Sequence, residues 1–143
     1  MSIEAILLPL FIQVALTFVL LFWMLILRLR AVRRGEVARE KIALREPHWP
    51  PRVMQVSNAF HNSMEMPVLF YVAVLLGLLS MTLDVTVYVL MWMFVLSRIV
   101  HATIHVTSNN LRHRTPMFLV GAIALALIWI IIAGRIIAFQ SLS

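Results

Sequence analysis

The sequence contains no cysteine among its 143 residues. This absence excludes disulfide bonds, a cysteine nucleophile and a thiolate metal site. Any thiol that reacts here must therefore arrive with a ligand. Charged residues are also scarce, at 13%, whereas a soluble domain has about a quarter. Because 62% of the residues are hydrophobic, the composition indicates an integral membrane protein, and one domain over residues 1–143 suffices for this length.

Neither a strand pattern nor an internal repeat is visible, but four long apolar runs are. Each run can supply the roughly 20 residues that cross a hydrocarbon core of about 30 Å. Backbone groups inside lipid must be satisfied within their own segment, so these runs are expected to be helices. The predicted fold class is an all-α membrane protein, a four-transmembrane-helix bundle with helices over about 5–30, 53–82, 85–108 and 115–138.

Acidic residues are few, 6 against 12 lysines and arginines, and the basic residues are unevenly placed. Eight lie between Arg28 and Arg52, and the segment indicates a loop that binds lipid phosphates or an anionic ligand rather than nucleic acid. This loop and the link 109–114 lie on one side of four alternating helices. The positive-inside rule puts that side in the cytoplasm and both termini in the periplasm or lumen, as in a bacterial inner membrane.

The first apolar run is expected to remain in the mature protein as a membrane anchor. Glu4 precedes it, and the chain shows neither a basic leader nor a small-residue cleavage site. Within the run, Gln13 and Thr17 are four residues apart and share a helix face. We interpret this pair as a contact with another helix.

The second run opens with a cluster of polar residues, Asn58, His61, Asn62 and Glu65, which share one helix face. A carboxylate near the centre of a membrane span costs at least about 2.5 kcal/mol, so it usually faces a partner, water or a ligand. Two interpretations stay open at this point. The cluster joins helices through hydrogen bonds, or it forms a polar ligand site inside the membrane.

The third run ends in a second polar stripe that contains Arg98, His101 and His105. An arginine at this depth needs an anion, and Glu65 is the acid available on a neighbouring helix. We predict that Arg98 and Glu65 lie near one another, as a structural ion pair or as part of a ligand site. The two histidines at i, i+4 suit a metal, but they lack a nearby carboxylate. Hydrogen bonding to neighbours or to a ligand is the preferred interpretation, and no metal is expected.

The fourth helix is expected to begin at Arg112-His113-Arg114-Thr115-Pro116, with threonine before a proline at the first helical position. An anion is stabilised at such a terminus by the helix dipole, the hydroxyl and the guanidinium together. A thiolate is such an anion, and its solution pKa of about 8.5 falls near an arginine. The alternative is that Arg114 only meets lipid phosphate.

Three pieces of sequence in this order resemble the MAPEG family, the membrane-associated proteins of eicosanoid and glutathione metabolism. Asn62-Ser63-Met64-Glu65 resembles the family's Asn-x-x-Glu on the second helix. Arg98-Ile99-Val100-His101 resembles its Arg-x-x-His on the third, and Arg114-Thr115 resembles its Arg-Ser or Arg-Thr at the start of the fourth. The resemblance covers most of the chain and points to a bacterial-type member.

The resemblance implies a homotrimer that binds glutathione, as cosubstrate, at each subunit interface. Arg114 would then stabilise the glutathione thiolate with help from Thr115. Arg30 or Arg33 would contact a carboxylate. The ligand-binding positions carried over are Asn58, His61, Asn62, Glu65, Arg98, His101, His105, Arg30 and Arg33.

The chain departs from the family pattern at several of these places. Arginines of the second helix are replaced by Gln55, Asn58 and His61, which removes positive charge that would meet carboxylates. A tyrosine of the third helix is replaced by His105, and one early in the fourth helix by Phe118, so two phenolic donors are lost.

Two functions from different classes follow from these residues. The first is a glutathione-dependent transferase or peroxidase that acts on lipophilic electrophiles entering from the bilayer. The second is a non-catalytic membrane protein that binds a lipid or a partner helix in the same pocket. The expected partners are membrane lipids, further copies of the chain and a lipophilic small molecule. A secondary transporter ranks behind both, because inverted repeats and broken helices are not visible.

Overall fold

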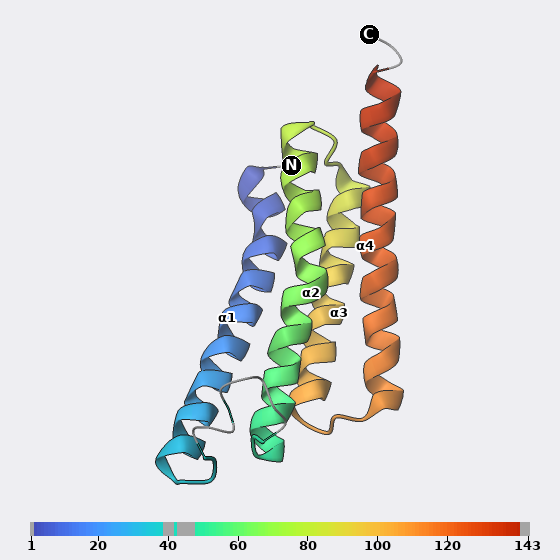
Figure 1. Cartoon of the computed structure of the whole chain (residues 1–143). Helices are drawn as coiled ribbons and strands as arrows, with labels where there is room; N and C mark the ends of the chain where they lie inside the picture. The colour runs from blue at the N-terminus through green and yellow to red at the C-terminus, as the bar shows by residue number, and fades with distance from the viewer. Residues whose placement is uncertain (1, 39–41, 43–47, 141–143) are drawn as a thin grey trace.

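In the computed structural model, the chain folds into long helices that stand side by side (Figure 1). They are α1 (Ile3–Arg33), α2 (Pro51–Leu79), α3 (Val85–Val106) and α4 (Leu111–Gln140). All four are long and apolar enough to span a membrane, which confirms the predicted all-α membrane bundle. The structure describes residues 2–38, 42 and 48–140, so Arg39, Lys41 and Arg45 of the basic loop lie outside the described residues.

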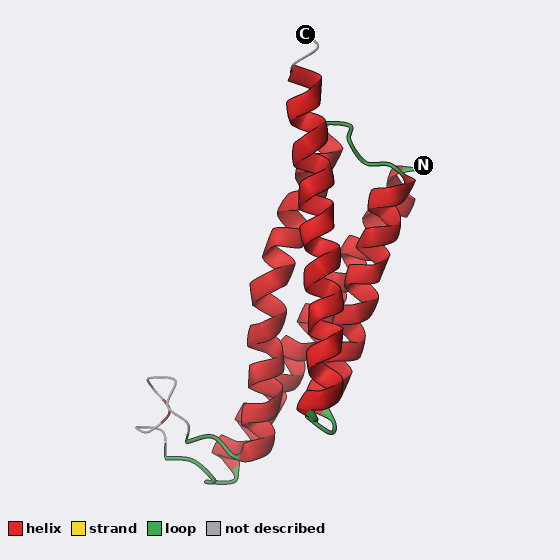
Figure 2. Ribbon diagram, turned by 90° about the vertical axis from the view of Figure 1, so that its right-hand side faces the viewer, coloured by secondary structure: helices red, strands yellow, loops and turns green. Residues whose placement is uncertain are grey.

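Successive helices run in opposite directions, so the bundle has two distinct ends (Figures 1 and 2). The terminal end carries the start of α1, the α2–α3 turn and the end of α4. The basic-loop end carries the α1–α2 connection and the α3–α4 connection. The last turns of α4 extend beyond the other helices at the terminal end (Figure 1).

Local sequence explains where the second and third helices begin. Pro51 occupies the first turn of α2, where a missing backbone N–H does no harm. Asp84 caps α3, because its carboxylate accepts a 3.0 Å hydrogen bond from the backbone N–H of Val87. Since α2 ends at Leu79 and α3 begins at Val85, the short turn makes these helices antiparallel neighbours.

The core lies where α2, α3 and α4 pack together. Phe70 and Phe94 stack at its centre, with 4.6 Å between ring centroids. Gly121 permits the close approach of α4 to α3: a Cβ at this position would lie 2.6 Å from the Ser97 hydroxyl. Small residues serve this purpose in membrane proteins, where helices associate by close packing rather than by the hydrophobic effect.

Hydrogen bonds between side chains join α1 to α2. The hydroxyls of Thr17 and Ser63 are 3.0 Å apart, and Arg28 donates to the Ser57 hydroxyl at 2.8 Å. The predicted interhelical contact is therefore confirmed for Thr17. Gln13, one turn away, is fully buried, but its amide has no hydrogen-bond partner among the described residues.

The predicted start of the fourth helix at Thr115–Pro116 is wrong. The helix begins at Leu111, and Pro116 lies inside it. Asn110 supplies the cap instead, because its side-chain oxygen accepts from the N–H of Arg112 at 2.9 Å. Arg114 and Thr115 therefore lie beyond the first residues of the helix, whose dipole and free N–H groups act mainly at its very end.

Candidate functional site

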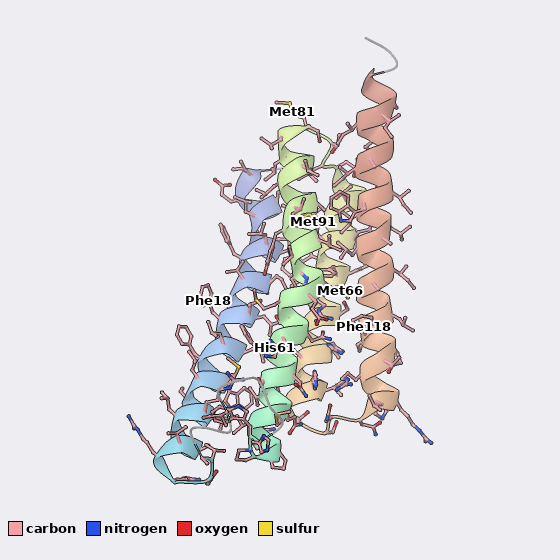
Figure 3. All side chains as sticks on the ribbon, viewed as in Figure 1. Phe18, His61, Met66, Met81, Met91 and Phe118 are labelled. Carbon is pink, nitrogen blue, oxygen red and sulfur yellow. The ribbon has the colours of Figure 1, made fainter. Side chains whose placement is uncertain are left out.

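A small cavity lies between α2, α3 and α4 at the basic-loop end. Its volume is about 140 Å³. It is lined by Asn62, His101, Arg114, Thr115 and Phe118. Phe118 lies on α4 at this end of the bundle, and its ring is 5.9 Å from that of His101 on α3 (Figure 3). Four predicted site residues thus meet around one space, together with Phe118.

Arg98 does not line the cavity, but it bonds to the lining residue Asn62 and is only 2% exposed. Its Nη2 donates to both the backbone oxygen and the side-chain oxygen of Asn62, at 3.0 and 2.5 Å. Its guanidinium carbon also lies 5.9 Å from the centre of the Phe118 ring. The remaining nitrogens, Nε and Nη1, are buried without a hydrogen-bond partner among the described residues. A buried guanidinium is thus only partly satisfied by neutral oxygens.

The predicted approach of Glu65 to Arg98 holds only in part. Glu65 acts on Arg98 electrostatically, but the described residues form no ion pair between them. Glu65 was expected to be buried, and it is exposed on the outer face of α2 together with Asn58. The physical reason is the helical turn: Ser63 faces α1, and Glu65, two residues later, lies on nearly the opposite side of α2.

His101 and His105 are both buried on the face of α3 that carries Arg98. Their rings are 5.8 Å apart. His101 lines the cavity directly, whereas His105 does not. The Nδ1 atom of His105 is buried and has no partner among the described residues. This stripe adds the imidazole of His101 to the cavity wall, which also contains Arg114.

Arg114 reaches the cavity from α4 and is half-buried. Its Nη1 donates to the side-chain oxygen of Asn109 at 2.5 Å, and the described residues offer it no carboxylate. The Arg114 guanidinium therefore lies at the cavity without a carboxylate partner among the described residues. Sequence reasoning missed Asn109, although two adjacent asparagines between apolar runs are typical of a turn with local side-chain hydrogen bonds.

The remaining predicted residues lie apart from the cavity within one chain. Arg30 and Arg33 are exposed near the end of α1, and no hydrogen bond or ion pair joins either side chain to another described residue. His61 lies on α2, with its ring 5.6 Å from that of Phe60 (Figure 3).

Gln55 has a structural role at the end of α3. Its amide nitrogen donates to the backbone oxygens of His105 and Thr107 at 2.8 and 3.0 Å. Arg52 donates to the oxygen of Val106 beside them. Together they satisfy carbonyls that the last turn of a helix leaves free. The Gln55 amide is therefore committed to α3 rather than to a ligand.

A larger cavity of about 690 Å³ lies at the terminal end, but its charges are already paired. Arg135 donates to the carboxylate of Asp84 and to the backbone oxygen of Thr82, both at 2.6 Å. The hydrogen bond from Arg135, and then that from the Val87 N–H, lowers the pKa of Asp84 to about 2. Because the arginine at this cavity already has a carboxylate partner, the smaller cavity is the better candidate for a functional site.

The fold and the cavity define a class: a multi-pass membrane protein whose helices hold guanidinium, imidazole and amide groups around a space near one end of the bundle. The chain belongs to the MAPEG family, whose family model matches residues 6–134. This is a family of glutathione-related membrane enzymes. No curated protein and no solved structure is similar enough to the chain to be matched.

Proposed function

We propose that the protein is a glutathione-dependent transferase or peroxidase that acts on lipophilic electrophiles dissolved in the bilayer. The observation that carries the proposal is a shortage of anions. Arg114 lines the cavity and Arg98 bonds to the lining residue Asn62, and the described residues provide neither arginine with an ion-pair partner. Buried or half-buried cations are stable beside an anion, and a thiolate or a carboxylate of glutathione supplies one.

Arg114 would hold the sulfur of glutathione as a thiolate, with the Thr115 hydroxyl as a second donor. The thiol gives its proton to water, and the sulfur lone pair forms a bond to an electrophilic carbon while the leaving group departs with its electrons. With a hydroperoxide, the thiolate attacks the terminal oxygen, the O–O bond breaks, and the departing alkoxide takes a proton from water to leave as an alcohol. A second glutathione then condenses with the resulting sulfenic acid to give disulfide and water.

The size of the cavity supports a site shared between subunits. Ligand pockets usually measure about 300–1,000 Å³. One chain provides about 140 Å³, which is room for the thiol end of a tripeptide but not for all of it. Asn58 and Glu65 are exposed on α2, a spanning helix where polar groups are costly against lipid. A neighbouring copy in a homotrimer would cover them, complete the walls and bring Arg30 or Arg33 near.

The site would lie toward the cytoplasm, where glutathione is abundant. The basic residues gather at the basic-loop end, and the positive-inside rule orients that end inward with both termini outside. The electrophile would reach the sulfur from the lipid side of α4, and glutathione from the water side of the α3–α4 connection.

Replacement of Arg114 by alanine tests this function. Removing one preorganised donor to a developing or resident anion typically costs about a hundredfold to a thousandfold in rate. We expect R114A to lose conjugation activity by that factor while its thermal unfolding and oligomeric state stay unchanged. Arg112 is exposed and lies two residues earlier in the same helix, so Arg112→Ala is the matched control and should keep full activity. Equal activity of R114A and wild type would end the proposal.

A second candidate is non-catalytic binding of a lipid or a partner helix in the same cavity. It is favoured by Gln55, whose amide caps α3, and by Phe118, which offers no hydroxyl to a thiolate. Thermal stability in detergent separates the two candidates. Stabilisation by glutathione supports the enzyme, whereas no shift together with a co-purified lipid supports the binding protein.

A further inference from the structure

The connection between α3 and α4 contains a residue whose backbone and side chain have separate tasks. Asn109 adopts a positive φ of 50°, a conformation that non-glycine residues rarely adopt and that asparagine tolerates best among them. Its N–H donates to the backbone oxygen of Ile104 at 2.7 Å, which closes the last turn of α3. The backbone of Asn109 therefore ends the helix.

The side chain of Asn109 is free for a different purpose, and it turns to α4. Its amide oxygen accepts a hydrogen bond from Nη1 of Arg114 at 2.5 Å. The neighbouring Asn110 is used otherwise, because its side chain caps α4 through the Arg112 N–H at 2.9 Å. The two adjacent asparagines thus have different roles: the side chain of Asn109 binds the Arg114 guanidinium, and that of Asn110 caps α4.

We propose that Asn109 is a positioning residue that keeps the Arg114 guanidinium at the cavity and away from the lipid phosphates. This inference rests on the proposed function of Arg114. An arginine side chain is long, and at a membrane surface it readily extends toward the headgroups. A neutral amide oxygen holds the guanidinium without neutralising it, so its full charge remains available to a thiolate.

The choice of an amide over a carboxylate follows from the same chemistry. An aspartate at this position would bind Arg114 more strongly, but its negative charge would oppose the thiolate that the arginine is meant to stabilise. A glycine would keep the positive φ and release the side chain altogether. These two substitutions separate the backbone task of residue 109 from its side-chain task.

The first measurement needs no glutathione. The rate at which phenylglyoxal modifies Arg114 is followed by peptide mass spectrometry in lipid nanodiscs, for wild type, Asn109→Gly and Asn110→Gly. We expect Asn109→Gly to raise the rate about tenfold, because a charge-assisted hydrogen bond is lost. Asn110→Gly should lower the unfolding temperature through the lost cap and leave the rate near that of wild type. An unchanged rate in Asn109→Gly overturns the proposal.

The second measurement follows the ultraviolet absorbance of bound glutathione thiolate against pH. In Asn109→Gly the thiolate should form at higher pH than in wild type, and the difference should grow with the fraction of anionic lipid that competes for Arg114. Asn109→Asp should also move the titration upward, but without the lipid dependence. A titration in Asn109→Gly identical to that of wild type contradicts the positioning role. Absence of any thiolate in wild type instead contradicts the proposed function, and the modification rate still decides whether Asn109 holds Arg114.

Discussion

The two ends of the bundle differ in the partners of the arginines that lie at their helix contacts. At the terminal end, Arg135 and Asp84 form a 2.6 Å ion pair that ties α4 to the α2–α3 turn. At the basic-loop end, Arg98 rests on the neutral oxygens of Asn62, and Arg114 on that of Asn109. Both ends have arginines at helix contacts, but among the described residues Arg135 has a carboxylate partner, whereas Arg98 and Arg114 have none.

This difference distinguishes Arg135, whose role is structural, from Arg98 and Arg114, which we propose bind an anionic ligand. A completed ion pair between exposed groups contributes modestly to stability and leaves no charge for chemistry. A buried guanidinium bonded only to amides and carbonyls is less stable by itself, and it gains most when an anion arrives. The larger cavity of the terminal end is therefore the weaker candidate for the proposed site, because its arginine already has a carboxylate partner.

Replacement of Arg98 by methionine should have the largest effect on the comparison. The variant removes a charge that is 2% exposed and keeps most of the side-chain volume. We expect the affinity for glutathione to fall about tenfold to a hundredfold, since a charged hydrogen bond is lost. Without glutathione, the unfolding temperature should stay close to that of wild type or rise. Isothermal titration and thermal unfolding in the same detergent give both values.

Arg112→Met is the control for Arg98→Met, because Arg112 is exposed and does not line the cavity. The outcome that contradicts the comparison is the reverse pattern, with severe destabilisation of Arg98→Met and normal binding in the molecules that remain folded. Arg98 would then be as structural as Arg135.

Replacement of Gly121 by leucine tests whether close packing of α3 and α4 shapes the cavity. Even a Cβ at Gly121 would lie 2.6 Å from the Ser97 hydroxyl and 3.6 Å from Cδ of Arg98. Overpacking of this kind costs about 1–3 kcal/mol and should separate α4 from Arg98. We expect both a lower unfolding temperature and weaker glutathione binding.

Gly134→Leu is the matched control on the same helix, nearer the terminal end. A Cβ there meets no atom within 4 Å, so the substitution should leave stability and binding unchanged. Equal behaviour of the two variants would show that the approach of α4 to α3 does not shape the cavity.

The sequence predicted the helices well because their cause is local. Long apolar runs between polar segments require membrane-spanning helices, and the observed bounds differ from the expected ones by only a few residues at most ends. The exception is the start of α4. A Thr-Pro pair is typical of a helix start, but the competing cap at Asn110 begins the helix several residues earlier, and Pro116 is tolerated inside it.

The partners of the site residues were harder to predict than the residues themselves. The opposite charges of Arg98 and Glu65 suggested an ion pair. Instead, Asn62 faces α3 and accepts the hydrogen bonds of the Arg98 guanidinium. The direction of a side chain across a helix contact depends on helix rotation, which a hydrophobic pattern fixes only loosely when apolar residues surround the helix. For the same reason, the sequence did not predict that Gln55 caps α3 or that Asn109 binds Arg114.

A smaller effect is expected when a hydroxyl is restored to the cavity. Phe118→Tyr would add a phenolic donor to a ring that lies 5.9 Å from His101 and from the Arg98 guanidinium. If the sulfur of glutathione sits in this cavity, conjugation should rise about threefold to tenfold, the worth of one hydrogen bond. Phe22→Tyr, on the exposed face of α1, is the control and should change nothing. A fall in activity of Phe118→Tyr would place the sulfur elsewhere.

The smallest effect should come from Asp84→Asn, which leaves Arg135 without its carboxylate partner. Because hydrogen bonding to Arg135 lowers the pKa of Asp84 from 3.8 to about 2, the carboxylate stabilises the fold above pH 3.8 and loses this contribution as pH falls toward 2. At neutral pH we expect the variant to unfold a few degrees below wild type in detergent, and the gap to close over that acidic window. Glutathione affinity should not change, because Asp84 and the cavity lie at opposite ends of the bundle. A loss of binding in Asp84→Asn would mean that the two ends are coupled, since a purely local ion pair leaves the distant cavity unaffected.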